Sequence, residues 1–273
     1  MKINSIEVFF NSFIYFVARW LLHVPYMSRF LPEHRLKITF KTEDVLGRHL
    51  YKYGICEPSN TKCFLENIPL KENDVIIDVG ANIGWFSLIF SRYGPANMKV
   101  FSFEPDPLNY QLLKRNVEQN DAKQVICHAE ALSNKIGDEI LYLYPSKNRG
   151  RHSLLPINEG QQVKVATTTL DAFLPAQNIE YSQVKFVKID VEGYEYFVLQ
   201  GSQQLLEHVP FVHTEYSPSY MEKGGVAFSD FLNTLYQRSY IPKIIGNEGL
   251  LIDTSYESLL HPERGMDLLW IKE

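Results

Sequence analysis

The chain has 273 residues, of which 45% are hydrophobic and 22% charged, a composition typical of a globular protein with a substantial core. Its net charge of −5 argues against binding to nucleic acid, which needs a basic face to displace counterions. The three cysteines, Cys56, Cys63 and Cys127, form neither a CxxC pair nor a metal-ligand pattern, and they favour a reducing cytoplasm over a disulfide framework.

Residues 1–35 are predicted to form an amphipathic helical extension ahead of a catalytic domain at residues 36–273. Within residues 6–31, bulky apolar side chains recur at helical spacing, at Phe9, Phe13, Phe16, Trp20 and Val24. Polar residues interrupt this run, so it lacks the roughly 20 nearly uncharged residues of a spanning helix, and no signal cleavage site follows it. The helix is expected to pack on the domain or on a second subunit, or to lie on the inner face of a membrane.

From about residue 70 to residue 220 the chain is predicted to alternate strands and helices, after a loop at Pro58 to Asn60. Short apolar runs predict strands at 75–78, 100–103, 125–128, 185–189 and 211–216. Helical periodicity predicts helices at 85–93, 108–117 and 194–200. Closing strands are predicted at 241–245, 250–252 and 268–271. This alternation is typical of a Rossmann-like α/β fold, in which helices cover both faces of a mainly parallel sheet.

A glycine-bearing loop follows the first of these strands, with the sequence Asp78-Val-Gly80-Ala-Asn82-Ile-Gly84. Glycine lets the backbone approach a ligand without a Cβ in the way. A dinucleotide fingerprint would have glycine in place of Asn82, and Asp78 suits a cationic amino-acid moiety better than a pyrophosphate. The loop therefore predicts a site for a cationic cofactor, with an NAD site and a turn without a ligand as the alternatives.

Glu104 ends the second strand 20 positions after Gly84, where a carboxylate can accept both hydroxyls of a ribose. Pro105 and Pro107 restrict the chain around it. Ribose binding is expected of adenosylmethionine and of NAD alike, so this residue does not distinguish the two cofactors. A solvated surface carboxylate is the remaining alternative.

Together these motifs resemble the FkbM family of methyltransferases. The resemblance covers about residues 53 to 220 and rests on the segments ENDVIIDVGANIGWFS, FSFEPDP, ALSNKIGDE, TTTLDAF, VKFVKIDVEGYEYFVLQG and HTEYSP in the same order. It implies a class I methyltransferase fold with a mainly parallel seven-stranded sheet, so that residues 36–273 would be the methyltransferase domain. It also implies S-adenosylmethionine as cofactor and O-methylation of a hydroxyl on a sugar, glycan or natural product.

The resemblance also assigns cofactor residues one by one. Asp78, Gly80, Ala81, Asn82 and Gly84 match the cofactor loop, and Glu104 matches the ribose carboxylate. Glu57 matches an upstream acidic position that closes over the cofactor, and Ala131 and Leu132 match the stretch that edges the adenine.

Catalytic candidates gather after the fourth and fifth parallel strands. Asp190 and Glu192 follow the fourth strand, at the sheet edge where Rossmann-like folds present ligands, and either carboxylate can take the proton of an attacking hydroxyl. Asp190 is also expected to contact the cofactor. His213 and Glu215 share one face of the fifth strand by its period of two. Asp190 and Glu215 are the preferred bases, with Glu192 and His213 as reserves.

Each of these candidates has an alternative. Glu192 and Glu195 could instead cap the following helix, and His213 could be a buried structural histidine. The clustered carboxylates would also allow a divalent metal such as Mg²⁺ or Ca²⁺, which the spacing neither requires nor excludes.

Substrate contacts are expected from the polar, basic segment 146–153 and from a nearby tyrosine. His152 and Ser153 could donate hydrogen bonds to a glycan. Tyr194 could supply a face on which a sugar stacks. A surface loop and simple packing are the alternatives.

The sequence therefore predicts an S-adenosylmethionine-dependent O-methyltransferase that acts on a sugar, glycan or glycolipid precursor. A natural-product hydroxyl is the alternative acceptor. An NAD-dependent oxidoreductase and a non-catalytic cofactor-binding scaffold are the alternative functions.

Overall fold

The computed structural model describes residues 5–144, 148–157, 159–262 and 264–273. Its centre is an eight-stranded sheet with the strand order β12-β11-β13-β10-β9-β3-β4-β5. Five neighbouring strands, β10 to β5 in that order, are parallel, whereas β13 runs antiparallel to both β10 and β11. The predicted class I α/β fold with a mainly parallel sheet is confirmed. The sheet has one strand more than the seven that the family resemblance implies, and β12 corresponds to the closing strand predicted at 250–252.

The strands of the large sheet are β3 (Val75–Val79), β4 (Lys99–Phe103), β5 (Val125–His128), β9 (Val184–Ile189), β10 (Phe211–Tyr216), β11 (Tyr240–Ile245), β12 (Leu251–Asp253) and β13 (Met266–Lys272). A separate hairpin contains β1 (Tyr26–Leu31) and β2 (Leu36–Lys41), and a three-stranded sheet contains β6 (Ala131–Leu132), β7 (Gly137–Tyr142) and β8 (Gln162–Thr168). The helices are α1 (Ser5–Phe16), α2 (Val45–Tyr53), α3 (Pro58–Asn67), α4 (Trp85–Tyr93), α5 (Pro107–Gln119), α6 (Leu170–Ala176), α7 (Glu195–Gln200), α8 (Pro218–Lys223), α9 (Phe228–Tyr236) and α10 (Tyr256–Leu260).

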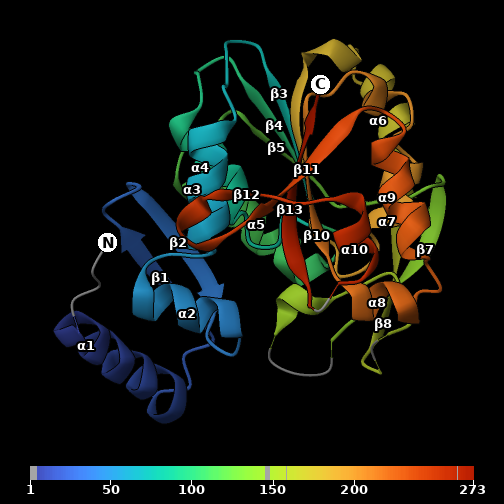
Figure 1. Ribbon diagram of the computed structural model, residues 1–273. Coiled ribbons are helices and arrows are strands. Elements are labelled where there is room, and N and C mark those ends of the chain that lie inside the picture. Colours follow the sequence, from blue (N-terminus) through green and yellow to red (C-terminus); the bar gives the residue numbers. More distant parts are fainter. Residues whose placement is uncertain (1–4, 145–147, 158, 263) are drawn as a thin grey trace.

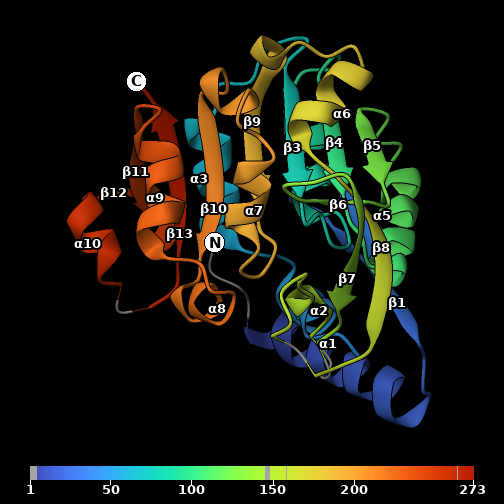
Figure 2. The same ribbon diagram turned by 90° about the vertical axis from the view of Figure 1, so that its right-hand side faces the viewer.

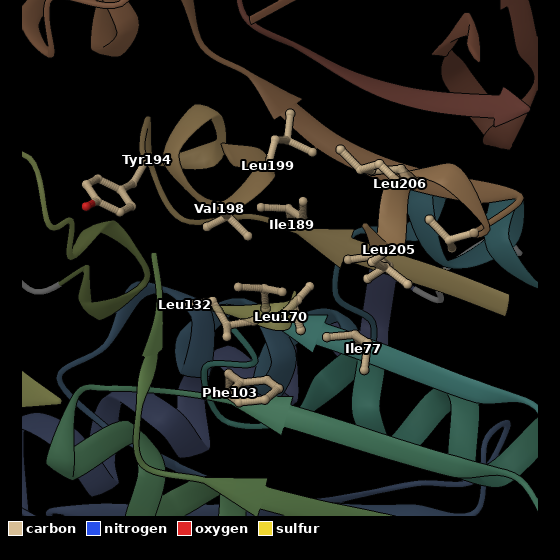
Figure 3. Close-up of a cluster of buried hydrophobic side chains, with 14 of the residues drawn as sticks. Ile77, Phe103, Leu132, Leu170, Ile189, Tyr194, Val198, Leu199, Leu205 and Leu206 are labelled. Atoms are coloured by element: carbon tan, nitrogen blue, oxygen red, sulfur yellow. The ribbon is translucent and has the colours of Figure 1, made fainter. Parts of the chain in front are cut away.

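Both faces of the large sheet are buried under helices. Helices α3, α4 and α5 cover one face, and α6, α7 and α9 cover the other (Figures 1 and 2). Because side chains alternate along a strand, Ile76 packs into the first layer and Ile77 into the second. Figure 3 shows the second layer, where Ile77 and Phe103 from the sheet meet Leu170, Val198 and other side chains from the covering elements. This double burial explains why the parallel strands read as continuous apolar runs.

The N-terminal region differs from the predicted helical extension. Helix α1 continues into a π-helical turn at Val17–Leu21, but residues 26–31 then form strand β1 and pair with β2. The helix cannot continue because His23 has a φ of +52° and Pro25 follows it. The predicted boundary at residue 35 therefore falls within the turn of a hairpin.

The predicted loop at Pro58 to Asn60 is also wrong, because these residues begin helix α3. Proline is favoured in the first turn of a helix, where its missing N–H has no partner to lose. The helix buries Cys63 and Phe64 against the large sheet.

Across the described residues, no helix combines the length and the apolar character that crossing a bilayer requires.

Candidate active site

The loop after β3 is shaped by two glycines with positive φ. Gly80 has a φ of +75°, and a Cβ at this position would lie 1.9 Å from the carbonyl oxygen of Asp190. The amides of Gly80 and Ala81 both donate to the carbonyl of Phe103, at 3.0 and 2.9 Å. Gly84, with a φ of +92°, precedes the first residue of α4. The loop is thereby fixed between the carboxyl ends of β4 and β9, where only glycine fits at its first position.

Glu104 lies directly beyond β4 and is only 6% exposed. Its carboxylate accepts hydrogen bonds from the amides of Asn82 (2.8 Å) and Asp106 (2.9 Å). Burial raises the pKa of Glu104 to about 8, although both amides act in the opposite direction. A carboxylate offers about four lone-pair sites, so roughly two remain for a ligand with two neighbouring hydroxyls.

A cavity opens beside this loop at the carboxyl ends of β3, β4 and β9. It contains about 1140 Å³ of empty space, its open mouth included. Apolar side chains such as Leu132, Leu141 and Leu154 form part of its wall. The predicted cofactor residues that line it are Glu57, Gly80, Ala81, Asn82, Glu104, Ala131, Leu132 and Asp190.

Two predicted cofactor residues, Asp78 and Gly84, are not among the residues that line the cavity. Asp78 is fully buried below the loop and accepts a hydrogen bond from the hydroxyl of Ser87 at 2.6 Å. A Cβ at Gly84 would lie 2.7 Å from Leu113, so this glycine allows α4 to approach α5. The expected direct contact of Asp78 with a ligand is therefore corrected, and Gly84 is a packing residue.

Lys188, which sequence reasoning missed, connects Asp78 to the cavity. Its ammonium lies 3.6 Å from Asp78 and 3.2 Å from Asp190, and its side chain is 2% exposed. Burial disfavours the charge, but Asp190, Asp78 and Glu57 outweigh it and raise the pKa of Lys188. The signal in the sequence was a lysine between Val187 and Ile189 within a buried strand, because a buried lysine needs acidic partners.

Three carboxylates meet next to this ion pair. One oxygen each from Asp190, Glu192 and Glu215 lies within 4.8 Å of the others. Asp190 and Glu192 line both the main cavity and a second, outer cavity, whereas Glu215 lines only the outer one. Among the described residues this is the group that could hold a metal ion. Without a cation, three carboxylates this close together would repel one another, so protons must neutralise part of their charge.

The electrostatics of this acidic cluster favour protonation. Burial, followed by the charges of Asp190 and Glu192, raises the pKa of Glu215 to about 10. Burial and the charge of Asp190 likewise raise the pKa of Glu192 well above its ordinary range. One oxygen of Glu215 is buried without a hydrogen-bond partner. The cluster therefore retains protons at neutral pH.

His213 lies outside both cavities. It is fully buried, its Nε2 lies 3.0 Å from Asp267, and its ring packs edge-on against Phe64. Burial would raise the pKa of Asp267, but His213 outweighs it and holds that pKa below its usual value. Asp267 lines the outer cavity beside Glu215, so His213 reaches the site only through this carboxylate.

The described part of the polar segment predicted to contact substrate contributes to the wall of the main cavity. Of this segment, residues 146 and 147 lie outside the described residues. His152 and Ser153 both line the cavity. His152 accepts a hydrogen bond at Nδ1 from the amide of Tyr144 (2.9 Å), and its Nε2 lies 3.5 Å from Asp106. Ser153 donates to the carbonyl of Glu192 at 2.9 Å, which fixes the segment to the acidic cluster.

Tyr194 also lines the cavity, but its ring stacks on Phe197 and its hydroxyl bonds to Ser133 at 2.9 Å.

Glu195 is fully buried and accepts hydrogen bonds from the amides of Val191 and Gly193, at 3.0 and 3.3 Å. Glu195 thus holds the turn before α7 and also accepts from its own amide, the first of that helix, as the structural alternative for this residue predicts.

The charged side chains that line the main cavity suit a cationic ligand better than an anionic one. Glu57, Glu104, Asp190 and Glu192 all line it, and the ammonium of Lys188 is engaged by two aspartates. A pyrophosphate would meet repulsion here, whereas a ligand with a ribose diol, an apolar aromatic ring and cationic groups fits the carboxylates and the apolar wall. S-adenosylmethionine has all three features.

Comparisons with known proteins agree with this chemistry. Residues 78–242 match the family model of the methyltransferase FkbM domain. The chain is similar to hexuronic acid methyltransferase AglP of Haloferax volcanii, with 33% identity over 145 residues that cover 53% of this chain and 56% of AglP. It is also similar to 2-O-methyltransferase NoeI of Sinorhizobium fredii, with 26% identity over 74% of this chain and 89% of NoeI.

Solved structures include a methyltransferase FkbM from Methylobacillus flagellatus with a similar chain path. The superposition has a TM-score of 0.49 at 17% identity and covers 81% of this chain and 49% of that chain. The alignment with AglP spans just over half of that relative's length, 56%.

Proposed function

Because the chain belongs to the FkbM methyltransferase family, we propose that it transfers the methyl group of S-adenosylmethionine to a hydroxyl of a sugar, glycan or glycolipid precursor. The observation that carries this proposal is one cavity with the Glu104 carboxylate in one wall and the acidic pair Asp190 and Glu192 in another. The first matches a ribose, and the second can receive a proton from an acceptor hydroxyl.

The cofactor, when bound, supplies a methyl group on a positively charged sulfur. Glu104 would hold the ribose hydroxyls through its free lone pairs, while Ala131 and Leu132 would contact the adenine. Gly80, Ala81 and Asn82 would border the cofactor through their backbone. Glu57 and Asp190 would favour its cationic groups, and Asp78 would act indirectly by fixing Lys188.

We assign the general base to Glu192, with Asp190 as the charge that tunes it. The sequence favoured Asp190 and Glu215, but Glu215 has a pKa of about 10 and therefore keeps its proton at neutral pH. Glu192 lines both cavities, and burial with the neighbouring Asp190 raises its pKa toward the working pH. A base is most effective when its pKa lies near the pH at which it works. His213 is assigned a positioning role through Asp267.

A carbohydrate acceptor is supported by two observations. The names of AglP and NoeI refer to a hexuronic acid methyltransferase and a 2-O-methyltransferase. The outer cavity is lined by hydrogen-bonding side chains, including Asn60, Glu215 and Asp267, which suit a molecule rich in hydroxyls.

The free thiols Cys56, Cys63 and Cys127 support the expected cytoplasmic location.

The proposal is tested by following radiolabelled methyl transfer to a panel of hexuronic acids, neutral hexosides and non-sugar alcohols. Glu192→Gln should slow turnover by about 10²- to 10⁴-fold, the range for a lost general base, while adenosylhomocysteine still binds. Asp190→Asn should retain turnover but move the rise of rate with pH to lower pH, because it removes a charge that raises the pKa of Glu192.

The exposed Glu222→Gln serves as the matched control and should behave like the wild type. Wild-type turnover by Glu192→Gln would remove that residue as the base. Binding of NADH in place of adenosylhomocysteine would favour an oxidoreductase, and cofactor binding with no turnover on any hydroxyl would favour a scaffold.

A further inference from the structure

Helix α1 presents an exposed, strongly apolar face to the outside of the molecule. Phe9 is 67% exposed and Phe13 is 58% exposed, one helical turn apart. We call this surface the aromatic face; it consists of Ile6, Phe9, Phe10, Phe13, Phe16 and Trp20, all more than half exposed. Monomeric proteins rarely expose so many large apolar side chains next to one another, and such patches mark sites of interaction.

The opposite face of the same helix is held against the domain. Tyr15 is buried, and α1 packs against α2. Within the described residues 5–21 the only charged side chains are Glu7 and Arg19, and both form ion pairs with residues that follow the helix. Glu7 pairs with Arg29 at 2.8 Å and Arg19 with Glu43 at 3.2 Å. The two ion pairs fix α1 in position, and the guanidinium of Arg19 lies over the ring of Trp20, 5.2 Å from its centroid, so a positive charge borders the aromatic face.

The N-terminal region to which the aromatic face belongs is basic, although the chain as a whole is acidic. Residues 1–53 contain eight Lys or Arg and four Asp or Glu, a net charge of +4, in a chain whose total is −5. Arg48 is an exposed side chain of α2, the helix against which α1 packs. Positive charge beside an exposed aromatic surface complements an anionic layer of lipid head groups.

The aromatic face also lies at the functional end of the molecule. The parallel strands point toward the end at which α1 and α2 lie (Figure 2). Helix α2, on which α1 rests, contributes Leu46 to the wall of the main cavity. A surface that binds α1 would therefore face the same end of the protein as the cavity.

We propose that the aromatic face binds the surface of an anionic phospholipid bilayer, with α1 lying in the plane of the interface. Aromatic side chains would enter the boundary between head groups and acyl chains, and the basic region would bind the head groups. Residues 5–21 are too few for a helix that crosses a bilayer, which needs about 20 apolar residues. A second copy of the chain fits less well, because two regions with a net charge of +4 would repel each other.

The test is flotation of the full chain with vesicles of phosphatidylcholine alone or with about 30% phosphatidylglycerol. We expect binding to the anionic vesicles, weaker binding to the neutral ones, and release as salt shortens the Debye length from about 8 Å to about 3 Å. Phe9→Ser with Phe13→Ser should lower vesicle binding by about tenfold or more, because two aromatic side chains no longer leave water.

The matched control is Ile136→Ser with Leu250→Ser, which removes two equally exposed apolar side chains, 69% and 65%, elsewhere on the surface. This control should bind vesicles like the wild type. Equal binding by the Phe9 and Phe13 double variant, or no binding by the wild type, overturns the proposal. So does a wild-type dimer in light scattering that the double variant converts to a monomer, since a second copy would then cover the face.

Discussion

At the scale of single residues, Glu104 has an unusual distribution of hydrogen bonds. One backbone amide donates to each oxygen of its carboxylate, and its pKa of about 8 means that Glu104 is mostly protonated at neutral pH when the site is empty. The ionised form accepts two ribose hydroxyls, whereas the protonated form has lost an acceptor site. Glu104→Gln should therefore weaken adenosylhomocysteine binding by about 1.5–3 kcal/mol, roughly 10- to 150-fold in the dissociation constant.

Calorimetry at several pH values measures this effect. Wild-type affinity should rise as the pH increases through about 8, the pKa of Glu104, and this rise should be absent in Glu104→Gln. The exposed Glu118→Gln on α5 is the control. An unchanged dissociation constant in Glu104→Gln would remove this carboxylate from the cofactor site.

Glu215 makes stability depend on pH. Its pKa of about 10 in the folded protein exceeds the value of about 4.3 for an unfolded chain, so the folded state binds the proton more tightly. The free energy of unfolding should therefore fall as pH rises from about 4.3 toward 10. Glu215→Gln resembles the protonated carboxyl, so it should match the wild type near pH 5 and be more stable than the wild type near pH 9.

Urea denaturation at both pH values tests this expectation. The exposed Glu222→Gln should show the same pH dependence as the wild type. A parallel decline of the wild type and Glu215→Gln with pH would mean that the buried charge is neutralised in another way, such as by a bound cation.

Residues whose positions depend on local sequence were predictable, and residues whose surroundings depend on neighbours distant in sequence were not. Glu104 follows a strand at a recognisable distance from the glycine loop, and it lines the cavity as expected. Asp78 precedes the same loop, yet its environment is set by Lys188, which is 110 positions away in sequence and 3.6 Å away in space. Periodicity places a side chain on one face of a strand but does not identify its partner.

At the scale of elements, the turn after β3 depends on the close approach of two strand ends. A Cβ at Gly80 would lie 1.9 Å from the carbonyl oxygen of Asp190, whereas a Cβ at Gly225 would have no atom within 4 Å. The φ values of the two glycines are similar, +75° and +69°. Gly225→Ala should therefore cost only the backbone strain, about 1–2 kcal/mol. Gly80→Ala should cost about 2–5 kcal/mol, because overpacking adds to that strain.

Thermal and urea denaturation of the two variants provide the comparison. The Gly80→Ala variant should also lose cofactor affinity, because Asp190 must move to make room. Equal destabilisation by the two substitutions would show that the loop can shift away from β9 at little cost.

The elements that the sequence revealed are those with a strong hydrophobic signal. Strand β3 is buried on both faces, and the predicted strand at 75–78 differs from it by one residue. Strands β7 and β8 were missed, because most of their side chains are exposed or half-buried and their sequences are rich in polar residues. Helix α3 was read as a loop from its proline and polar start, although its inner positions pack on the sheet.

At the scale of the whole molecule, the site depends on strand order. Glu57, Glu104, Asp190 and Glu215 are far apart in sequence and line two cavities at the same end of the sheet. Alternating strands and helices predicted a parallel sheet, but hydrophobic patterns do not specify which strands are neighbours. The family resemblance implied a mainly parallel sheet, but the order of its strands and the contacts among the acidic side chains became evident only in three dimensions.

The position of β13 affects how the protein folds during synthesis. This strand, at residues 266–272, fits between β10 and β11, which are both translated earlier. Its Trp270 is fully buried and donates to Thr214 on β10 at 3.0 Å. On the ribosome, therefore, β10 and β11 must wait with unpaired edges until residues 266–272 emerge, a period in which they are open to pairing with another chain.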